Sequence, residues 1–228
     1  MGRMGELAIP WVFLFSFILF ISVSPKIDFN KIQPFVENGI KPILHGSIAC
    51  IAFPFLELVV LLMIIPSVNK PQKIRKSFLQ GALIGGGIVF ILIVMCILVI
   101  GADLVQYITY PSYSLARKIN IGGFFERVEA MITLMWILTL FMKVSIHFYV
   151  FNIGLAQLFK LKEYRMLSLP TGLLMIVLST VIAPNIVYYN QILSEYWPYF
   201  DITYGLILPL LLLGVYYLRK LFKGHIQT

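Results

Sequence analysis

The chain has 228 residues, of which 60% are hydrophobic and 12% are charged, and its mean hydropathy is +0.91. Soluble globular domains carry about 25% charged residues, so this composition excludes an ordinary soluble enzyme or nucleic-acid-binding domain. The formal net charge of +8 indicates basic loops beside a membrane, because no nucleic-acid-binding motif accompanies it.

Six long apolar stretches occur along the chain, and each is long enough to cross the hydrocarbon core of a bilayer as a helix. They cover residues 7–23, 43–65, 78–102, 124–158, 167–183 and 202–218. The connections between them are short and show no internal repeat. We therefore expect an all-α integral membrane protein, with six transmembrane helices in a single transmembrane domain over residues 1–228.

The distribution of Lys and Arg between these stretches predicts the orientation, because basic loops stay in the cytoplasm. With the N-terminus inside, eleven basic residues fall on the inner side and five on the outer side. The inner residues are Arg3, Lys70, Lys73, Arg75, Lys76, Lys160, Lys162, Arg165, Arg219, Lys220 and Lys223, and the outer ones are Lys26, Lys31, Lys41, Arg117 and Lys118. We expect a multi-pass protein with both termini cytoplasmic.

The second stretch contains a proline and a carboxylate near its middle, in the run Phe53, Pro54, Phe55, Leu56, Glu57. Pro54 lacks a backbone donor, so an interruption of the helix is expected there. The fourteen Leu, Ile, Val and Phe residues of this stretch supply on the order of 4 to 8 kcal/mol for insertion, against a cost of about 3 kcal/mol for the carboxylate. Glu57 should therefore point into the bundle or a water-filled cavity. We interpret Phe53, Pro54, Phe55 and Glu57 as candidate ligand-binding or pore residues. The alternative is a protonated Glu57 that only packs helices.

Small and sulfur-bearing side chains inside the apolar stretches receive structural interpretations. The run Gly85–Gly87 is expected to allow close helix packing. Cys50 and Cys96 are expected to be small buried side chains, and they predict neither a disulfide nor a metal site. The sequence has no glycine-rich phosphate loop and no His-x-x-x-His or Glu-x-x-His arrangement. We therefore expect no enzyme activity, no metal and no cofactor.

The fourth stretch opens with three charged residues, Glu126, Arg127 and Glu129. They lie at the predicted outer boundary of the membrane, where charge costs little. We interpret them as outer-mouth charges that meet the polar connection before them, with an exposed helix start as the alternative.

Lys143 and His147 lie deeper in the same stretch. At about 100° per residue, Glu129, Trp136, Lys143 and His147 fall within about 40° of one another on one face. Lys143 and Glu129 are about 21 Å apart along the helix and cannot pair. We add Lys143 and His147 to the candidate ligand-binding or pore residues and predict that Lys143 pairs with Glu57. Snorkelling of Lys143 is the alternative, and His147 is either a packing residue or a proton relay.

The order of several motifs resembles the spore germination protein B-subunit family (GerAB type), a branch of the amino acid-polyamine-organocation permease superfamily. The matching features are Arg3 and Glu6 before Pro10, PFVENGIKPIL from Pro34, FPFLE from Phe53, Pro66, YPSYSLARKINIGGFFERVEA from Tyr110, Trp136, FMKVS from Phe141, and LFKLKEYRML from Leu158. This resemblance covers essentially the whole chain.

The resemblance implies a LeuT-like fold of ten helices in two inverted repeats, with ligand bound where the first and sixth helices are broken. The six stretches here would then be helices five to ten. The chain would be a partial inverted-repeat fold that lacks the first four helices. A fifth helix of this fold leaves the cytoplasm outward, as the charge distribution independently predicts for the first stretch.

The resemblance also implies a function. It suggests a membrane subunit of a nutrient germinant receptor in the spore inner membrane, which senses a small ligand such as an amino acid and triggers germination. The implied partners are the A and C subunits, the lipid bilayer and a small-molecule nutrient, with no nucleic acid. The alternatives are a secondary transporter of amino acids or amines, and an inactive truncated fragment.

Overall fold

The computed structural model describes residues 2–33, 39–68, 71–119 and 128–224, and these residues form helices, turns and connections without a strand. Six helical segments among them are long and apolar enough to cross a membrane. They are Gly2–Lys26, Gly46–Met63, Gln72–Ile100, Ala130–Leu158, Arg165–Ile182 and Trp197–Lys220. The prediction of an all-α integral membrane protein with six transmembrane helices is confirmed.

The chain divides into two compact units that are each built from two separate stretches of sequence. Unit 1 comprises Met1–Glu37 and Arg75–Tyr149, and unit 2 comprises Asn38–Ile74 and Val150–Thr228. The single transmembrane domain over residues 1–228 stays a prediction.

Unit 1 contains the helices α1 (Gly2–Val23), α4 (Ala102–Val105) and α5 (Pro111–Arg117), most of α3 (Pro71–Ile100) and the first part of α6 (Val128–Leu158). Its short 3-10 turns are η1 (Ser24–Lys26) and η2 (Phe29–Ile32). Pro111 stands at the first position of α5, where its missing N–H costs no helical hydrogen bond. Gly101 has a φ of 103°, a conformation that a residue without Cβ adopts readily, and the chain turns there from α3 into α4.

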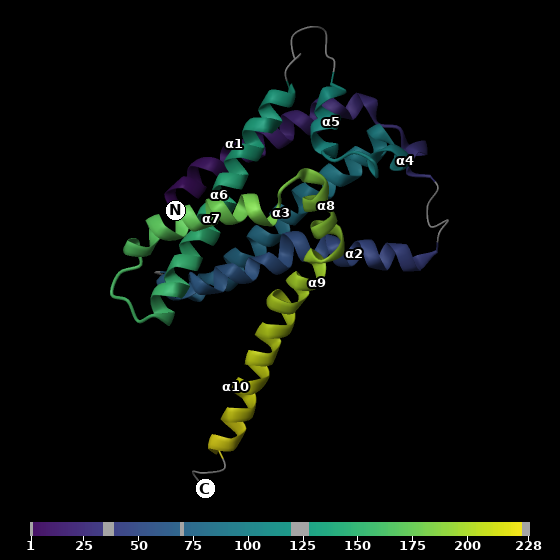
Figure 1. Cartoon of the computed structure of the whole chain (residues 1–228). Helices are drawn as coiled ribbons and strands as arrows, with labels where there is room; N and C mark the ends of the chain where they lie inside the picture. The colour runs from purple at the N-terminus through teal and green to yellow at the C-terminus, as the bar shows by residue number, and fades with distance from the viewer. Residues whose placement is uncertain (1, 34–38, 69–70, 120–127, 225–228) are drawn as a thin grey trace. The chain divides into compact units, whose positions relative to one another are not determined.

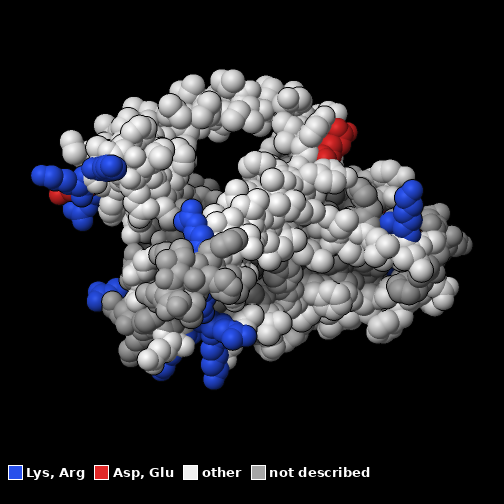
Figure 2. Space-filling view, turned by 90° about the horizontal axis from the view of Figure 1, so that it is seen from below, with Lys and Arg blue, Asp and Glu red and all other residues white. Residues whose placement is uncertain are grey.

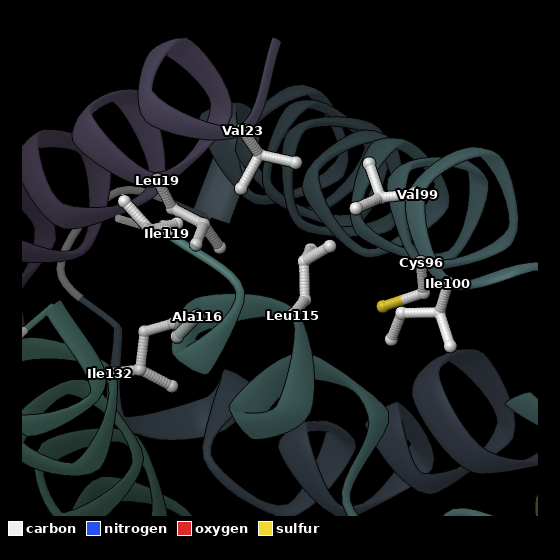
Figure 3. Packing of buried hydrophobic residues seen from close by; sticks show 9 residues of the cluster. All are labelled: Leu19, Val23, Cys96, Val99, Ile100, Leu115, Ala116, Ile119 and Ile132. Atoms are coloured by element: carbon white, nitrogen blue, oxygen red, sulfur yellow. The ribbon is translucent and has the colours of Figure 1, made fainter. Parts of the chain in front are cut away.

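The core of unit 1 is a cluster of buried apolar side chains at one end of α1 and α3 (Figure 3). Leu19 and Val23 of α1 and Val99 of α3 pack with Leu115 of α5 and Ile132 of α6. Cys96 is also buried in this cluster, whereas Cys50 is exposed in unit 2, and both thiols are free. The interpretation of Cys96 as a buried side chain is confirmed, and that of Cys50 is wrong.

Polar contacts close the same end of unit 1. The Lys31 ammonium donates to the Val99 carbonyl at 2.7 Å, and the Asp28 amide donates to the Leu98 carbonyl at 3.1 Å. The Lys26 ammonium donates to the Lys118 carbonyl. The last carbonyls of a helix have no partner within the helix, so Lys31 and Asp28 satisfy the C-terminal end of α3. Three basic residues that the topology prediction places on one side of the membrane therefore gather at one end of this unit.

The glycines of α3 do not make the close helix contacts that the sequence predicted. A Cβ added at Gly85 or Gly87 would meet no atom within 4 Å. Gly85 instead lines a cavity of about 400 Å³ between α1, α3 and α6, together with Gly5 and Met142. The prediction of close packing at these two glycines is wrong, because the neighbouring helices of unit 1 stand apart at this level.

Unit 2 contains α2 (Ile40–Phe55), α7 (Arg165–Ile182), α8 (Ile186–Glu195), α9 (Trp197–Ile202) and α10 (Leu208–Gly224), together with the end of α6. Its non-α segments are the 3-10 segments η3 (Leu56–Met63) and η4 (Ile65–Ser67) and the π-helical turn η5 (Thr203–Ile207). The span formed by α2 and η3 packs against α9 and η5, and α10 continues from them along the chain (Figure 1).

One buried polar contact joins α6 and α7 within unit 2. The Thr171 hydroxyl lies 2.8 Å from Oδ1 of Asn152, whose side chain is almost fully buried. The turn that ends α6 and leads to α7 is a Schellman motif. The Leu161 amide donates to the Ala156 carbonyl at 2.8 Å, and Lys160 has a φ of 53°.

Charged side chains are sparse on the surface that Figure 2 shows. Lys and Arg appear there as a few separate groups, Asp and Glu occupy still less of it, and uncharged residues cover most of the described surface in this view. Such a surface suits contact with lipid tails, since a charged side chain in the hydrocarbon core is costly.

Candidate functional site

The second span changes its helix type next to the proline that the sequence singled out. The α-helix α2 ends at Phe55, and the chain continues as the 3-10 segment η3 from Leu56. Pro54 has no amide hydrogen to give to the carbonyl one turn earlier, which weakens the α pattern at this point. The predicted interruption is present, and it places Glu57 in the first turn of η3.

The Glu57 side chain is buried, with 9% of its surface exposed. Of the other candidates in this run, Phe53 and Pro54 are half-buried and Phe55 is 40% exposed. The carboxylate therefore faces the protein and Phe55 is the most exposed of the group. This agrees with the expectation that a carboxylate within a span avoids lipid.

A second buried carboxylate, Asp201, lies in unit 2 on α9 and is completely inaccessible. The apolar stretch predicted from the sequence begins at residue 202 and therefore excludes Asp201. The helical span begins at Trp197, so Asp201 lies inside it as Glu57 lies inside the second span. Extending the stretch back to the aromatic residues Trp197 and Tyr199 would have revealed it.

Backbone packing brings the segments of these two carboxylates together. The glycine of η5, Gly205, lies so close to η3 that a Cβ there would stand 2.8 Å from both Cβ and the carbonyl oxygen of Leu56. Such an approach is possible only because Gly205 has no side chain. Leu56 precedes Glu57, and Gly205 lies four residues after Asp201.

Tyr204 belongs to the segment that lies between the two carboxylates. It follows Asp201 by three residues in η5, and η5 packs against η3, which carries Glu57. Among the described residues, these two are the buried carboxylates. Ionisable groups inside a membrane span are costly, so they mark functional positions far more often than surface charges do. Unit 2 thus contains a polar centre of two carboxylates and one hydroxyl, which we call the carboxylate site (Glu57, Asp201 and Tyr204).

A cavity of about 500 Å³ lies next to the carboxylate site, between η3 and α10. Its walls are apolar and include Val59, Met63, Leu208 and Leu212. Tyr204 belongs both to the lining of this cavity and to the carboxylate site. Tyr204 is the member of the carboxylate site that lines this cavity, whereas Glu57 and Asp201 are buried behind its apolar wall.

Two further candidates, Lys143 and His147, lie in the part of α6 that belongs to unit 1. Lys143 is exposed and His147 is half-buried. Nδ1 of His147 lies 2.9 Å from the Lys143 carbonyl oxygen. A carbonyl oxygen only accepts, so Nδ1 is the donor in this contact. Glu57 belongs to unit 2, and its predicted pairing with Lys143 stays a prediction.

The three predicted outer-mouth charges are not placed by the structure. Glu126 and Arg127 lie outside the described residues, and Glu129 is described only as backbone of α6. Trp136, on the face predicted to be polar, packs against the core of unit 1, and its ring lies 5.5 Å from that of Tyr110. That face of α6 therefore becomes apolar between Glu129 and Lys143.

No group of three or more His, Cys, Asp and Glu side chains that could hold a metal ion occurs among residues 2–33, 39–68, 71–119 and 128–224.

Comparison with known proteins adds a family match. The family model described as "Spore germination protein" matches residues 2–187. Spore germination protein KB of Bacillus subtilis (strain 168) is 31% identical over 224 residues, which are 96% of this chain and 60% of that protein. Spore germination protein YndE of the same organism is 31% identical over 177 residues, 73% of this chain and 46% of that protein. Spore germination protein XB of Bacillus anthracis is 25% identical over 138 residues, 60% of this chain and 38% of that protein. The chain thus spans about 60% of the length of the first of these relatives. No solved structure matches it significantly.

Proposed function

Because this chain belongs to the spore germination protein family, we propose that it is a membrane subunit of a nutrient germinant receptor that binds a small ligand at the carboxylate site. The observation that carries this proposal is the burial of Glu57 and Asp201 around Tyr204 within two membrane spans. Ligand sites of membrane proteins with broken helices lie at such interruptions, where polar groups are available inside the bilayer.

The chemistry of the site favours a ligand with an ammonium group. Carboxylates bind cationic amines through charge-assisted hydrogen bonds, and a low local dielectric strengthens that attraction. The adjacent cavity accepts an apolar substituent against Val59 and Leu208. An amino acid or amine has both parts. Phe53, Pro54 and Phe55 act by holding the interruption that presents Glu57, and Lys143 and His147 are proposed as further groups on the ligand path.

The family membership and the distribution of basic residues support a proposed cellular setting. The protein sits in the spore inner membrane with both termini cytoplasmic, and it acts together with the A and C subunits of the receptor. Its six spans correspond to helices five to ten of a permease-like inverted-repeat fold. Glu126, Arg127 and Glu129 form the outer mouth.

The test replaces each carboxylate by its neutral isostere, Glu57→Gln and Asp201→Asn, at the natural gene locus. Germination is followed with each of the twenty amino acids across concentrations. Each variant should need at least about tenfold more of the active amino acid, the effect of losing one hydrogen bond to a charged group. The matched control is Glu195→Gln, which changes an exposed carboxylate of α8 and should leave the response unchanged. Wild-type dose dependence in both carboxylate variants would reject the site.

A secondary transporter of amino acids or amines is the second candidate. Interrupted helices with intramembrane carboxylates are also the usual substrate sites of such transporters, which favours this alternative. Vesicles that contain the protein separate the two functions. A receptor binds a radiolabelled amino acid without accumulating it, whereas a transporter concentrates it inside in a manner that depends on an ion gradient.

A further inference from the structure

The π-helical turn η5 holds one more residue than an α-helix would need at that place. The Leu208 amide donates to the Thr203 carbonyl, five residues earlier, where an α-helix would use the carbonyl four residues earlier. Pro209 explains in part why this turn is not α-helical. An α pattern would pair residue 209 with the Gly205 carbonyl, but proline has no amide hydrogen and its ring crowds that carbonyl.

Contact with η3 favours the π register. Gly205 fits against the Leu56 backbone only because it lacks a Cβ. If the π turn became α-helical, its one extra residue would become part of a continuous α-helix. Each later residue would then occupy the position that the next residue in the chain occupies now. Tyr204 would then turn toward the space that Gly205 fills, and its side chain cannot lie 2.8 Å from the Leu56 carbonyl. Leu56 therefore sterically blocks the α-helical register of this turn.

Loss of the π turn would have a defined effect on α10. One residue of an α-helix corresponds to a rotation of about 100° and a rise of about 1.5 Å. Leu208, Leu212 and Tyr216 now line the cavity next to η3. After the change, Ile207, Leu211 and Val215 would face it instead, and the basic end of α10 with Arg219 and Lys220 would turn by the same angle.

We propose that η5 is a register switch, in which the position of Leu56 decides whether α10 takes its present orientation or one turned by about 100°. Displacement of η3 away from Gly205 releases the π turn and turns α10. The further step, in which ligand binding at Glu57 causes this displacement of η3, rests on the proposed function. The switch itself requires only Leu56, Gly205 and Pro209.

Disulfide trapping in proteoliposomes of the whole chain tests the switch without any ligand. The background carries Cys50→Ser and Cys96→Ala. Met63→Cys is combined with either Leu212→Cys or Leu211→Cys, and the yield of the disulfide 63–212 is compared with that of the disulfide 63–211. Met63 and Leu212 line the same cavity, so the pair with residue 212 should dominate in the parent. Pro209→Ala restores the missing donor and should raise the 211-to-212 yield ratio by about fivefold, the equilibrium effect of one additional hydrogen bond.

Two further variants keep the test decisive. Adding Leu56→Gly to Pro209→Ala removes the Leu56 Cβ, the side-chain part of the contact with Gly205, and leaves the carbonyl in place, so it should raise the ratio above that of Pro209→Ala alone. If neither Pro209→Ala nor this double variant raises the ratio above that of the parent, the switch is refuted. Deletion of Leu206 alone should leave the pair with residue 212 dominant, because the shortened turn becomes α-helical with α10 in its present orientation. A fixed π turn would instead bring residue 213 to Met63, which also refutes the switch. Neither result bears on the response of Glu57→Gln and Asp201→Asn to amino acids, so the two proposals fail separately.

Discussion

Tyr204 is the residue at which the polar and apolar parts of unit 2 meet. It lies three residues after Asp201, in the turn η5 that packs against the segment of Glu57, and it also lines the cavity beside η3. In the proposed function, a ligand whose amine reaches the carboxylates and whose apolar part lies in the cavity would contact Tyr204. Both the charge and the side-chain size of the ligand would then affect its binding.

The predicted pairing of Lys143 with Glu57 is testable at the scale of single residues. Glu57 is buried, so if Lys143 is its partner, removal of Lys143 leaves an uncompensated buried charge at a cost of roughly 3 to 5 kcal/mol, whereas removal of both residues can cost much less. Lys143→Met and Glu57→Gln should each lower the amount of this protein in the membrane fraction, measured by quantitative immunoblotting. The double variant should recover part of the loss.

A control pair separates this coupling from general damage. Lys220→Met and Glu195→Gln change exposed charges and should combine additively with little effect. If the losses of Lys143→Met and Glu57→Gln add strictly, the two residues do not pair.

At the scale of elements, unit 2 combines two departures from the α-helix, the 3-10 segment η3 and the π turn η5, which pack on each other. Each departure lies beside a proline, Pro54 before η3 and Pro209 after η5. Proline removes one hydrogen bond from a helix, so the backbone adopts another helical geometry there. Glu57 follows the first proline, and Asp201 precedes the π turn.

The contact between α6 and α7 gives a prediction at the same scale. Thr171→Val removes the hydroxyl that lies 2.8 Å from Asn152. The free energy of unfolding should fall by about 0.6 to 1.5 kcal/mol, the usual range for such a bond between membrane helices. Unfolding of the purified protein in mixed micelles measures this change.

Thr180→Val in the same helix is the matched control. The Thr180 hydroxyl is exposed and donates to the Val177 carbonyl of its own helix. Its replacement should leave the unfolding free energy nearly unchanged. Equal destabilisation by the two substitutions would show that the Asn152 contact contributes nothing specific.

For the whole molecule, the eleven-to-five distribution of basic residues predicts the orientation in the membrane. Single cysteines introduced at Lys73 and Lys162 should react with a membrane-impermeant maleimide only from the cytoplasmic side, and one at Glu195 only from the other side. All three side chains are exposed, so accessibility in the folded protein does not limit the reaction. Labelling of the Lys73 and Glu195 positions from the same side would overturn the topology.

Local chemistry in the sequence was enough to predict the six spans, the interruption at Pro54 and the burial of Glu57. Hydropathy over about twenty residues, the missing amide of proline and the cost of a carboxylate in lipid are properties of a short segment, so they can be read without knowing its neighbours. The packing of the segments that carry Glu57 and Asp201 could not be read in this way. It depends on the contact of Gly205 with Leu56, about 150 residues apart in the chain, and contacts of that kind arise from how helices pack rather than from any local pattern. The π turn that sets the orientation of α10 belongs to the same contact, because Pro209 permits several backbone geometries and the fit of Gly205 against η3 selects one of them.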